Sequence, residues 1–501
     1  MSNANVLAAA SSRRAGPRTE LHAALAHIEA YPLERTWRPA FLTPLCALPP
    51  PRRAPLADLP GERPPVAPFA GQALTIGAAL AGLRTRKLSA MDILQGALAA
   101  IGRGAQGPNA LLYVPPVATL RAEAEALDAE LRAGVCRGLL HGIPLLAPDL
   151  LDAIGMSAGG DSHALDGAPG HIPVADAGSV RLLRAAGALF VAQPRTKGPA
   201  RNGTTPPPRS RISDGDEENE ASGAAAAVAK GIGLGAPALD ACGSLHGAAA
   251  RCGLVSFKPT FGLIPNDGAH LPAWSIDQVG CLALTVEDAA LLLDVLDPAS
   301  HMRYSRCLFK APAGARIGVP PALLEGAEAG VAAALRAAAA AMRQAGAEVV
   351  EIETPTAEDF ALAQAAALVL RRAEAAAYQA LGGRRTQGSA PLAVKPSAEA
   401  GHVSAAHYLQ AQRIREDLRW RLLRLFDRCD ALLLPAGRAG ADRFGSAQNS
   451  VLWSLIGFPG VALPCGWTPQ RRPVGAELVA APYEDDRLLS IAAALELALR
   501  T

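Results

Sequence analysis

The sequence predicts an α/β fold in which a central mixed β-sheet is sandwiched between α-helices. Two segments show the pattern most clearly, because each runs from a helical stretch through a glycine into a strand: SVRLLRAAGALFVAQ (179–193) and GVAAALRAAAAAMRQAGAEVVEIE (330–353). Such alternation is typical of helices packed around a sheet. The chain has 501 residues, of which 50% are hydrophobic, and this is enough to bury a large core.

Local signals place further elements along this alternation. Ser89 and Asp92 form a capping box, which predicts a helix that ends near Ile101. Thr285 and Asp288 form a second helix start, ahead of the stretch AALLLDVL. The other expected elements are a buried strand at GIPLLA (142–147), an Ala-rich helix over Ala221–Lys230, the strand-like IGLGAPAL after it, and a helix-then-strand segment in YLQAQRIREDLRWRLLRLFDRCDALLLPA. We therefore expect one large α/β domain.

The first 71 residues differ in composition from the rest of the chain. Residues 1–20 are small, polar and basic, and LHAALAHIEA favours one short helix after them. The segment LPPPRRAPLADLPGERPPVAPFAG (48–71) is rich in proline, which removes backbone donors and favours extended structure. We expect an N-terminal extension over 1–47 that is partly disordered, a Pro-rich linker over 48–71, and the main domain over 72–501.

Charge and cysteine usage exclude several classes of protein. Lys and Arg total 48 and Asp and Glu total 46, a formal net charge of +2, so the sequence offers no field that would hold nucleic acid. No apolar run reaches the roughly 18 residues of a membrane span, and the N-terminus lacks the pattern of a secretory signal. The eight cysteines show no zinc-like spacing. We expect a cytoplasmic protein with reduced thiols, no metal and no cofactor.

Four stretches follow one another in an order that points to a family. They are HGIPLLAPDLLDAIGMSAGG (141–160), ASGAAAAVAKGIGLGAPALDACGSLHGAAARCGLVSFKPTFGLIP (221–265), SIDQVGCLALTVEDAALLLDVL (275–296) and IGFPGVALPCGWTPQRRPVGAELVAAPYEDDRLLSIAAALE (456–496). Together they resemble the amidase signature family of serine amidohydrolases. The resemblance implies a single amidase-signature domain, a mixed sheet of about eleven strands between helices, and hydrolysis of carbon–nitrogen bonds other than peptide bonds.

The resemblance also implies a serine nucleophile, a bridging serine on a cis peptide and a lysine base. A serine hydroxyl is a poor nucleophile until a neighbouring group takes its proton, and a lysine does so only when burial keeps it neutral. Carried over onto this chain, the nucleophile falls on Ser244, and Ala241, Cys242 and Gly243 supply an oxyanion hole. Cys242 stands where the family usually has glycine, and His246 where it usually has arginine. Without the resemblance, Ser244 would be an ordinary turn or helix-cap serine.

The other two catalytic positions hold residues of a different kind. The lysine position falls on Pro148, which has neither a titratable group nor a backbone N–H. The bridging-serine position falls on Glu220, and Ser222 is the nearest hydroxyl. Glu220 ends an acidic run over 214–220 that is typical of a solvated loop, and the alternative is that desolvation makes Glu220 a substitute base. Asp149 and Asp152, close to Pro148, are interpreted as capping or loop carboxylates.

Three hypotheses follow from this pattern. The leading one is a pseudoamidase, which keeps the fold and pocket but acts by binding a small amide-like ligand or a partner. The alternative is an active amidase in which Ser244 works with a different base: Glu220, His246 or Asp149. A Cys242 thiol beside His246 is a weaker candidate, since a buried cysteine is more often inert. The third hypothesis is a scaffold that docks a protein partner through residues 1–71; a homodimer is the commonest assembly.

Overall fold

The computed structural model of the chain describes residues 17–31, 68, 74–104, 111–156, 173–194, 222–301, 303–308, 313–325, 327–353, 355–380, 403–436 and 449–500. Their helices and strands alternate along the chain and form a mixed α/β fold, as the sequence predicts. The expected linker over 48–71 lies, apart from Pro68, outside the described residues, and the limits of the three expected segments stay predictions.

The described strands form two sheets. The larger has eight strands in the order β4-β6-β5-β10-β11-β9-β7-β8. It is antiparallel from β4 to β9, whereas β7 runs parallel to both β9 and β8. Its strands are β4 (Gly235–Asp240), β5 (Val255–Lys258), β6 (Gln278–Ala283), β7 (Arg316–Val319), β8 (Glu348–Glu351), β9 (Ala431–Pro435), β10 (Gly460–Trp467) and β11 (Pro473–Val479).

The smaller sheet has three strands in the order β1-β3-β2. They are β1 (Leu111–Tyr113), β2 (Pro144–Leu146) and β3 (Leu189–Pro194). A backbone hydrogen bond of 2.9 Å from Leu234 N to Pro144 O joins it to the residue before β4. The resemblance implied one sheet of about eleven strands, and the described strands are divided eight and three between two sheets that meet at β2 and β4.

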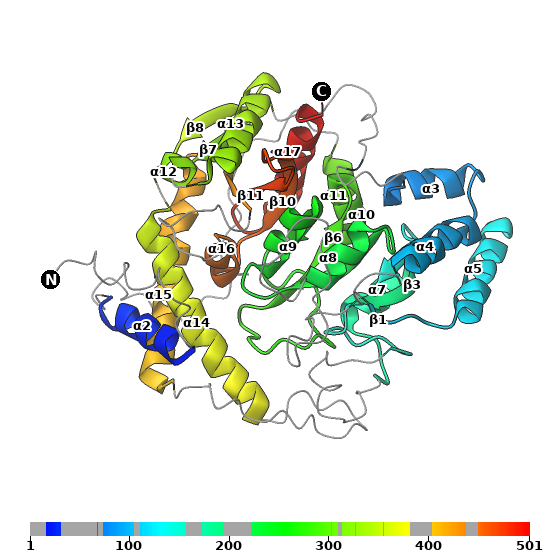
Figure 1. Cartoon of the computed structure of the whole chain (residues 1–501), viewed down its shortest axis with the longest axis horizontal. Coiled ribbons are helices and arrows are strands. Elements are labelled where there is room, and N and C mark those ends of the chain that lie inside the picture. Colours follow the sequence, from blue (N-terminus) through cyan, green and yellow to red (C-terminus); the bar gives the residue numbers. More distant parts are fainter. Residues whose placement is uncertain are drawn as a thin grey trace.

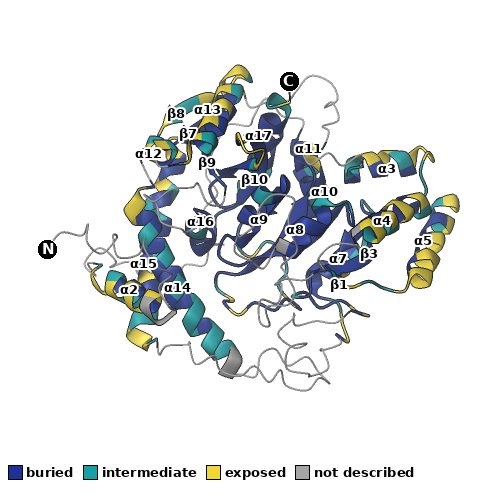
Figure 2. Cartoon of the chain, viewed as in Figure 1, coloured by how far each residue is buried: buried dark blue, intermediate teal, exposed yellow. Residues whose placement is uncertain are grey.

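Helices cover both faces of the large sheet (Figure 1). Side chains of α10, α13 and α17 share one buried cluster with Cys281 and Ala283, whereas those of α8 and α9 share another with Leu282. Because successive residues of a strand point to opposite faces, these two clusters lie on opposite sides of β6. Figure 2 shows the sheet and the central helices buried, with exposed residues on the outer faces of the peripheral helices.

The helices begin and end as follows. They are α2 (Pro17–Glu29), α3 (Ile76–Arg84), α4 (Ala90–Gly104), α5 (Val117–Arg132), α7 (Gly178–Ala185), α8 (Ser222–Ala229), α9 (Ser244–Cys252), α10 (Val286–Leu296), α11 (Arg303–Cys307), α12 (Pro321–Glu325), α13 (Ala329–Gln344), α14 (Ala357–Ala380), α15 (Ala405–Leu423), α16 (Ser450–Ile456) and α17 (Asp485–Ala498), with a short 3₁₀ turn at Arg424–Asp427. No helix in the described ranges is long and apolar enough to cross a membrane.

Both helix starts predicted from capping signals are confirmed. Ser89 Oγ accepts a hydrogen bond from Asp92 N at 3.0 Å, and Asp92 Oδ2 accepts one from Ser89 N at 2.9 Å, so the capping box opens α4. Thr285 accepts from Asp288 N at 3.1 Å and opens α10. The sequence alone predicts these helix starts because the donors and acceptors lie within three residues of each other.

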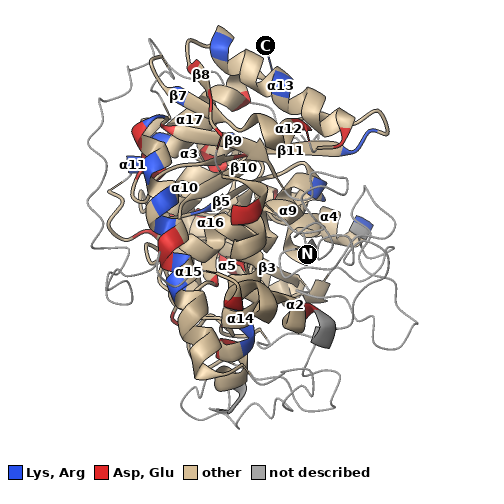
Figure 3. Ribbon diagram, turned by 90° about the vertical axis from the view of Figure 1, so that its left-hand side faces the viewer, with Lys and Arg blue, Asp and Glu red and all other residues tan. Residues whose placement is uncertain are grey.

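Helix α2, from the N-terminal extension, packs on α14 and α15. Leu21, Ala24 and Ile28 are buried in the cluster that those two helices form. Tyr31 donates to Asp417 at 2.5 Å just beyond its end. Figure 3 shows acidic and basic residues lying together along α15, which supplies this contact. At least residues 17–31 are therefore packed against the main domain, and docking of a separate partner through residues 1–71 stays a prediction.

Candidate functional site

The turn between β4 and α9, residues 240–244, holds the predicted nucleophile. Cys242 (φ +57°) and Gly243 (φ +83°) both adopt the left-handed conformation, which lets the chain reverse tightly between the strand and the helix. That conformation is costly for residues with a Cβ, so position 242 is one that favours glycine, and here a cysteine occupies it. Gly243 is required for a second reason, because a Cβ there would lie 2.6 Å from Ser450 of α16.

The buried carboxylate of Asp240 fixes this β4–α9 turn. It accepts hydrogen bonds from Gly243 N and Leu245 N, both at 3.1 Å, and from Ser454 Oγ at 2.5 Å. An acidic side chain at a helix N-terminus satisfies orphan N–H groups and complements the helix dipole. Asp240 therefore ties the last residue of β4, the start of α9 and helix α16 to one another.

Ser244 is the first residue of α9 and is only 4% exposed. Its Oγ accepts a hydrogen bond from Ala241 N at 3.1 Å, and within the described ranges this is the only hydrogen bond of that hydroxyl. Of the three amides predicted for the oxyanion hole, Ala241 N thus points at Ser244 and Gly243 N at Asp240. The roles of Ser244, Ala241, Cys242 and Gly243 stay predictions.

Pro148, at the predicted lysine position, is buried just beyond the end of β2. Its carbonyl oxygen accepts a hydrogen bond from Leu151 N at 3.0 Å, so the chain turns there. Asp149, one of the candidate substitute bases, lies within this turn and is completely buried. A catalytic role for Asp149 stays a prediction.

The bridging-serine position lies outside the described part of the chain. Glu220 and the acidic run over 214–220 both fall there, so the substitute-base hypothesis for Glu220 stays a prediction. Ser222, the nearest hydroxyl in the sequence, is the first residue of α8.

The turn after Pro148 brings together three residues that the sequence did not connect. Asp152 Oδ1 lies 3.0 Å from His270 Nε2, and Tyr378 Oη of α14 lies 3.4 Å from His270 Nδ1. Asp152 and His270 are both buried, and their positions in the sequence are 118 residues apart. The interpretation of Asp152 as a capping or loop carboxylate is therefore incomplete, since its carboxylate holds a histidine. No spacing motif signals a pair this far apart.

His246 faces away from Ser244. Two residues along a helix point to opposite sides, and His246 Nδ1 lies 2.8 Å from Ser256 Oγ on β5. Burial lowers the pKa of His246 to about 4, with Asp240 opposing the shift. In this arrangement the imidazole is neutral at pH 7 but contacts the sheet rather than the predicted nucleophile.

Lys258 is a fully buried lysine on β5 that motif reasoning passed over. Its Nζ donates to the carbonyl oxygen of Phe458. Burial lowers the pKa of Lys258, and the nearby carboxyl groups of Asp240, Asp485 and Glu477 oppose that shift. A lysine whose pKa is lowered by burial has the electrostatic character of a base, yet here its amino group is bonded to a backbone carbonyl.

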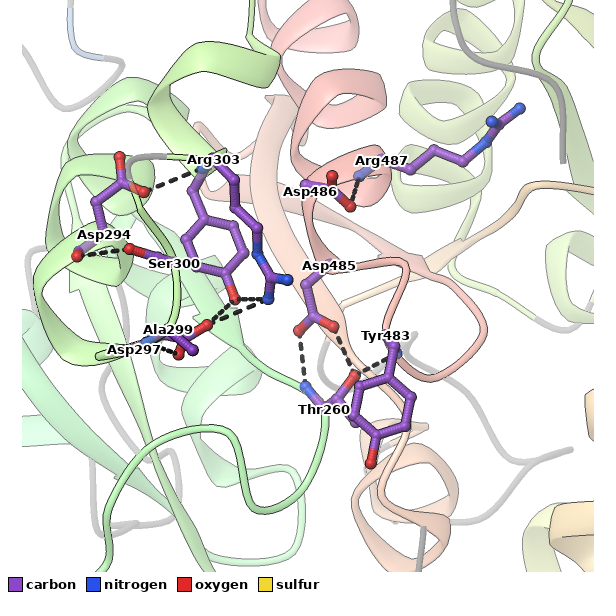
Figure 4. Close-up of polar contacts among 11 residues, drawn as sticks. Thr260, Asp294, Asp297, Ala299, Ser300, Arg303, Tyr483, Asp485, Asp486 and Arg487 are labelled. Atoms are coloured by element: carbon purple, nitrogen blue, oxygen red, sulfur yellow. Dashed lines mark hydrogen bonds and ion pairs between the residues drawn. The ribbon is translucent and has the colours of Figure 1, made fainter. Parts of the chain in front are cut away.

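The segment after Lys258 is locked to the N-terminus of α17. Thr260 donates to Asp485 twice, from N at 2.8 Å and from Oγ1 at 2.6 Å, and Tyr483 N donates to Thr260 Oγ1 at 2.8 Å (Figure 4). Burial raises the pKa of Asp485 to about 6, although these hydrogen bonds oppose the shift. The lock fixes the end of β5, on which Ser256 and Lys258 lie beneath α9.

Comparison with known proteins identifies relatives of this chain. A model of the family described as Amidase matches residues 92–489. A glutamyl-tRNA(Gln) amidotransferase subunit of Synechococcus sp. (strain JA-2-3B'a(2-13)) is 30% identical over 429 residues, which cover 75% of this chain and 82% of that protein. Among solved structures, an amidase is similar with a TM-score of 0.69 and 28% identity, over 85% of this chain and 99% of the other. The peptide amidase of Stenotrophomonas maltophilia is similar with a TM-score of 0.66 and 27% identity, over 87% of this chain and 98% of the other.

We predict that Gly243→Ala destabilises the protein more than Gly262→Ala does. Both glycines have positive φ, which costs a residue with a Cβ about 1–2 kcal/mol. Only at Gly243 does the new Cβ meet Ser450, at 2.6 Å, whereas at Gly262 nothing lies within 4 Å. Overpacking adds roughly 1–3 kcal/mol. Thermal unfolding of the two variants measures the difference, and equal losses of stability would contradict close packing of the β4–α9 turn on α16.

Proposed function

The chain belongs to the amidase family, and we propose that within this family it is a pseudoamidase, which binds a carboxamide-type ligand without hydrolysing it efficiently. The family's fold and the turn that holds Ser244 are both present. What differs, by the resemblance, is the group that would activate the serine.

The observation that carries this proposal is the surroundings of the Ser244 hydroxyl. Within the described residues its only hydrogen-bond partner is the amide of Ala241, which donates and therefore cannot take a proton. Pro148 has no basic group to offer at the position where the family has its lysine. His246 points to Ser256 instead.

The expected loss of rate is large. A positioned acid–base group supplies about 10²–10⁴-fold, and serine hydrolases stripped of their catalytic side chains keep roughly 10³–10⁴-fold over water. Because uncatalysed amide hydrolysis is so slow, that residual acceleration gives no useful turnover. Binding does not depend on the base, since the backbone of the β4–α9 turn is held by Asp240 and by the packing of Gly243 on α16.

The ligand class follows from the relatives. They include a peptide amidase and one subunit of an amidotransferase, whose names share amide chemistry. A carboxamide, with one carbonyl acceptor and one N–H₂ donor, suits a site whose serine hydroxyl can both donate and accept a hydrogen bond. We propose this class for the site beside Ser244.

A second candidate is active hydrolysis with a different base. The observation that favours it is the Asp152–His270 pair, which begins four residues after Pro148 and couples a carboxylate to an imidazole whose other nitrogen lies 3.4 Å from Tyr378 Oη. His270 lies on the loop that leads into β6, and Gln278 at the start of β6 pairs with Asp240. In this candidate His270, held by Asp152, replaces the missing lysine.

We predict slow modification of Ser244 by a fluorophosphonate, read by mass spectrometry. Relative to the Stenotrophomonas maltophilia peptide amidase labelled in parallel, the rate falls by about 10²–10⁴-fold, because no base removes the hydroxyl proton. Ser244→Ala sets the background. Fast labelling that disappears in Ser244→Ala would refute the pseudoamidase, and its further loss in His270→Gln would establish the second candidate.

We predict that restoring both positions restores reactivity. In the double variant Pro148→Lys/Glu220→Ser, labelling of Ser244 rises by at least about 10²-fold, because a buried lysine and a bridging hydroxyl reconnect the serine to a base. The matched control is Pro148→Arg/Glu220→Ser, in which the guanidinium stays protonated and labelling stays slow. If the folded lysine variant labels no faster than the arginine variant, position 148 is not the base position.

We predict that simple carboxamides stabilise the protein against heat. Using benzamide and propionamide as probes, a concentration of about 100 times Kd adds about 2.7 kcal/mol to the free energy of unfolding. Benzoate, of similar shape but without the amide N–H₂, serves as the control. Thermal unfolding that is unchanged by both amides would count against carboxamide binding, whichever way the labelling experiment turns out.

A further inference from the structure

Beneath the β4–α9 turn, two titratable side chains face each other in the core. His246 lies on α9 and Glu477 on β11, and both are completely buried. Their outer atoms are bonded: His246 Nδ1 lies 2.8 Å from Ser256 Oγ, and Glu477 Oε2 accepts from Ser450 Oγ at 2.7 Å. We call these two residues the His246–Glu477 pair.

The inner atoms of the pair point at each other. His246 Nε2 and Glu477 Oε1 are 3.8 Å apart, and neither has a hydrogen-bond partner in the described part of the chain. Gly460 of β10 lies beside them, since a Cβ there would be 2.8 Å from His246 Nε2 and 3.6 Å from Glu477 Oε1. The backbone of β10 thus encloses these two buried polar atoms. Each of the two is the nearest group with which the other could pair.

The surrounding charges and the burial of the pair determine its protonation state. Within the described ranges, the charged groups that act on both members are Asp240 of β4 and Lys258 of β5, one of each sign. Taking an isolated charge out of water is costly, so a buried acid and a buried imidazole both favour their neutral forms. In agreement, burial raises the pKa of Glu477 to about 8 and lowers the pKa of His246 to about 4.

We propose that at neutral pH Glu477 carries a proton on Oε1, opposite the unprotonated His246 Nε2, and that Glu477 is thereby a positioning residue for the β4–α9 turn. The donors and acceptors then form one continuous series. Ser450 donates to Glu477 Oε2, Glu477 Oε1–H faces the lone pair of His246 Nε2 across 3.8 Å, and His246 Nδ1–H donates to Ser256. This arrangement sets a donor against a lone pair at the two unpartnered atoms and costs no buried charge.

The series reaches the turn from two sides. Ser450 packs against Gly243, where an added Cβ would lie 2.6 Å from it. Because Ser450 is hydrogen-bonded to Glu477, Glu477 sets how closely α16 approaches the turn. His246 lies on the first turn of α9, two residues after Ser244. Loss of the proton leaves a carboxylate facing a lone pair in the core, and this repulsion loosens both contacts. The proposal concerns the position of the turn and holds whether or not Ser244 is reactive.

Infrared difference spectroscopy tests where the proton resides. The full-length protein at pH 7 is compared with Glu477→Gln, which keeps a neutral donor and acceptor of the same shape. We expect a band of a protonated carboxyl carbonyl in the wild type that is absent from the variant. If the difference spectrum instead shows a carboxylate band, Glu477 is ionised and the proposal is overturned.

Alkylation of Cys242 tests the positioning role, because this thiol lies in the turn and is only 5% exposed. At pH 7 we expect the rate of Cys242 modification by iodoacetamide to be unchanged in Glu477→Gln and to rise several-fold in Glu477→Leu, which removes the hydrogen bond of Ser450 and places an apolar side chain opposite His246 Nε2. The matched control is Asp288→Asn. Asp288 lies on α10, its pKa is also raised by burial to about 8, and its carboxyl bonds Gly77 N of α3 rather than a residue of the turn. Equal rates in Glu477→Gln and Glu477→Leu would show that the proton-bearing group does not position the turn.

The pH dependence has a definite sign. The folded pKa of Glu477, about 8, lies above its ordinary value of 4.5, so the folded protein retains a proton that the unfolded chain releases. The contribution of Glu477 to stability is complete below pH 4.5 and is lost as the pH rises through about 8. The ratio of Cys242 alkylation in wild type to that in Glu477→Gln should therefore rise across pH 8, since the thiol's own titration cancels in the ratio. A ratio that stays constant from pH 6 to pH 9 would overturn the proposal even if Glu477→Leu fails to fold.

Discussion

The hydrogen bonds of the Asp240 carboxylate are the interaction on which the rest of the candidate site depends. One buried side chain accepts from Gly243 N and Leu245 N of the turn and from Ser454 of α16. Without it, two backbone donors at the start of α9 would be buried unsatisfied, which is costly in a core. Asp240 is also the last residue of β4, the end strand of the large sheet that pairs with β6, so the sheet positions it. The large sheet thus positions Asp240, and Asp240 in turn fixes the conformation of the β4–α9 turn.

This construction explains how, under the proposed function, the turn that holds Ser244 is maintained without a basic side chain at position 148. Asp240, Gly243 and Ser450 hold the turn through backbone and buried contacts, and none of these contacts involves residue 148. In the proposed pseudoamidase, the proton acceptor is absent while the scaffold of Ser244 is unchanged. The proposed function follows from this separation: the backbone that shapes the site is stabilised independently of the side chain that would drive catalysis.

Burial determines the electrostatics below the turn. Lys258, His246 and Glu477 are fully buried within a short distance of Asp240, and burial moves the pKa of each toward its neutral form. Such groups persist only where their hydrogen bonds are satisfied by neighbours. Phe458 O, Ser256 and Ser450 each supply one such partner, from the α16–β10 loop, β5 and α16. These buried polar residues and their partners therefore join α9, the sheet and α16. The stability of their contacts depends on where one proton resides.

The sequence by itself determined the elements whose signals are local. The capping box at Ser89 and the N-cap at Thr285 placed the starts of α4 and α10, because their donors and acceptors lie within three residues. The order of four motifs identified the family and with it the α/β fold. It also placed Ser244 just after a strand, and the structure has it as the first residue of α9.

Only the tertiary structure decided which distant side chains meet. Asp152 contacts His270, 118 residues away, and His246 faces Glu477 because α9 lies across β10 and β11. No spacing in the sequence encodes these pairs, since they depend on the packing of helices on the sheet rather than on the periodicity of any one element. The strands likewise divide into sheets of eight and three, because that division depends on which edges pair in space.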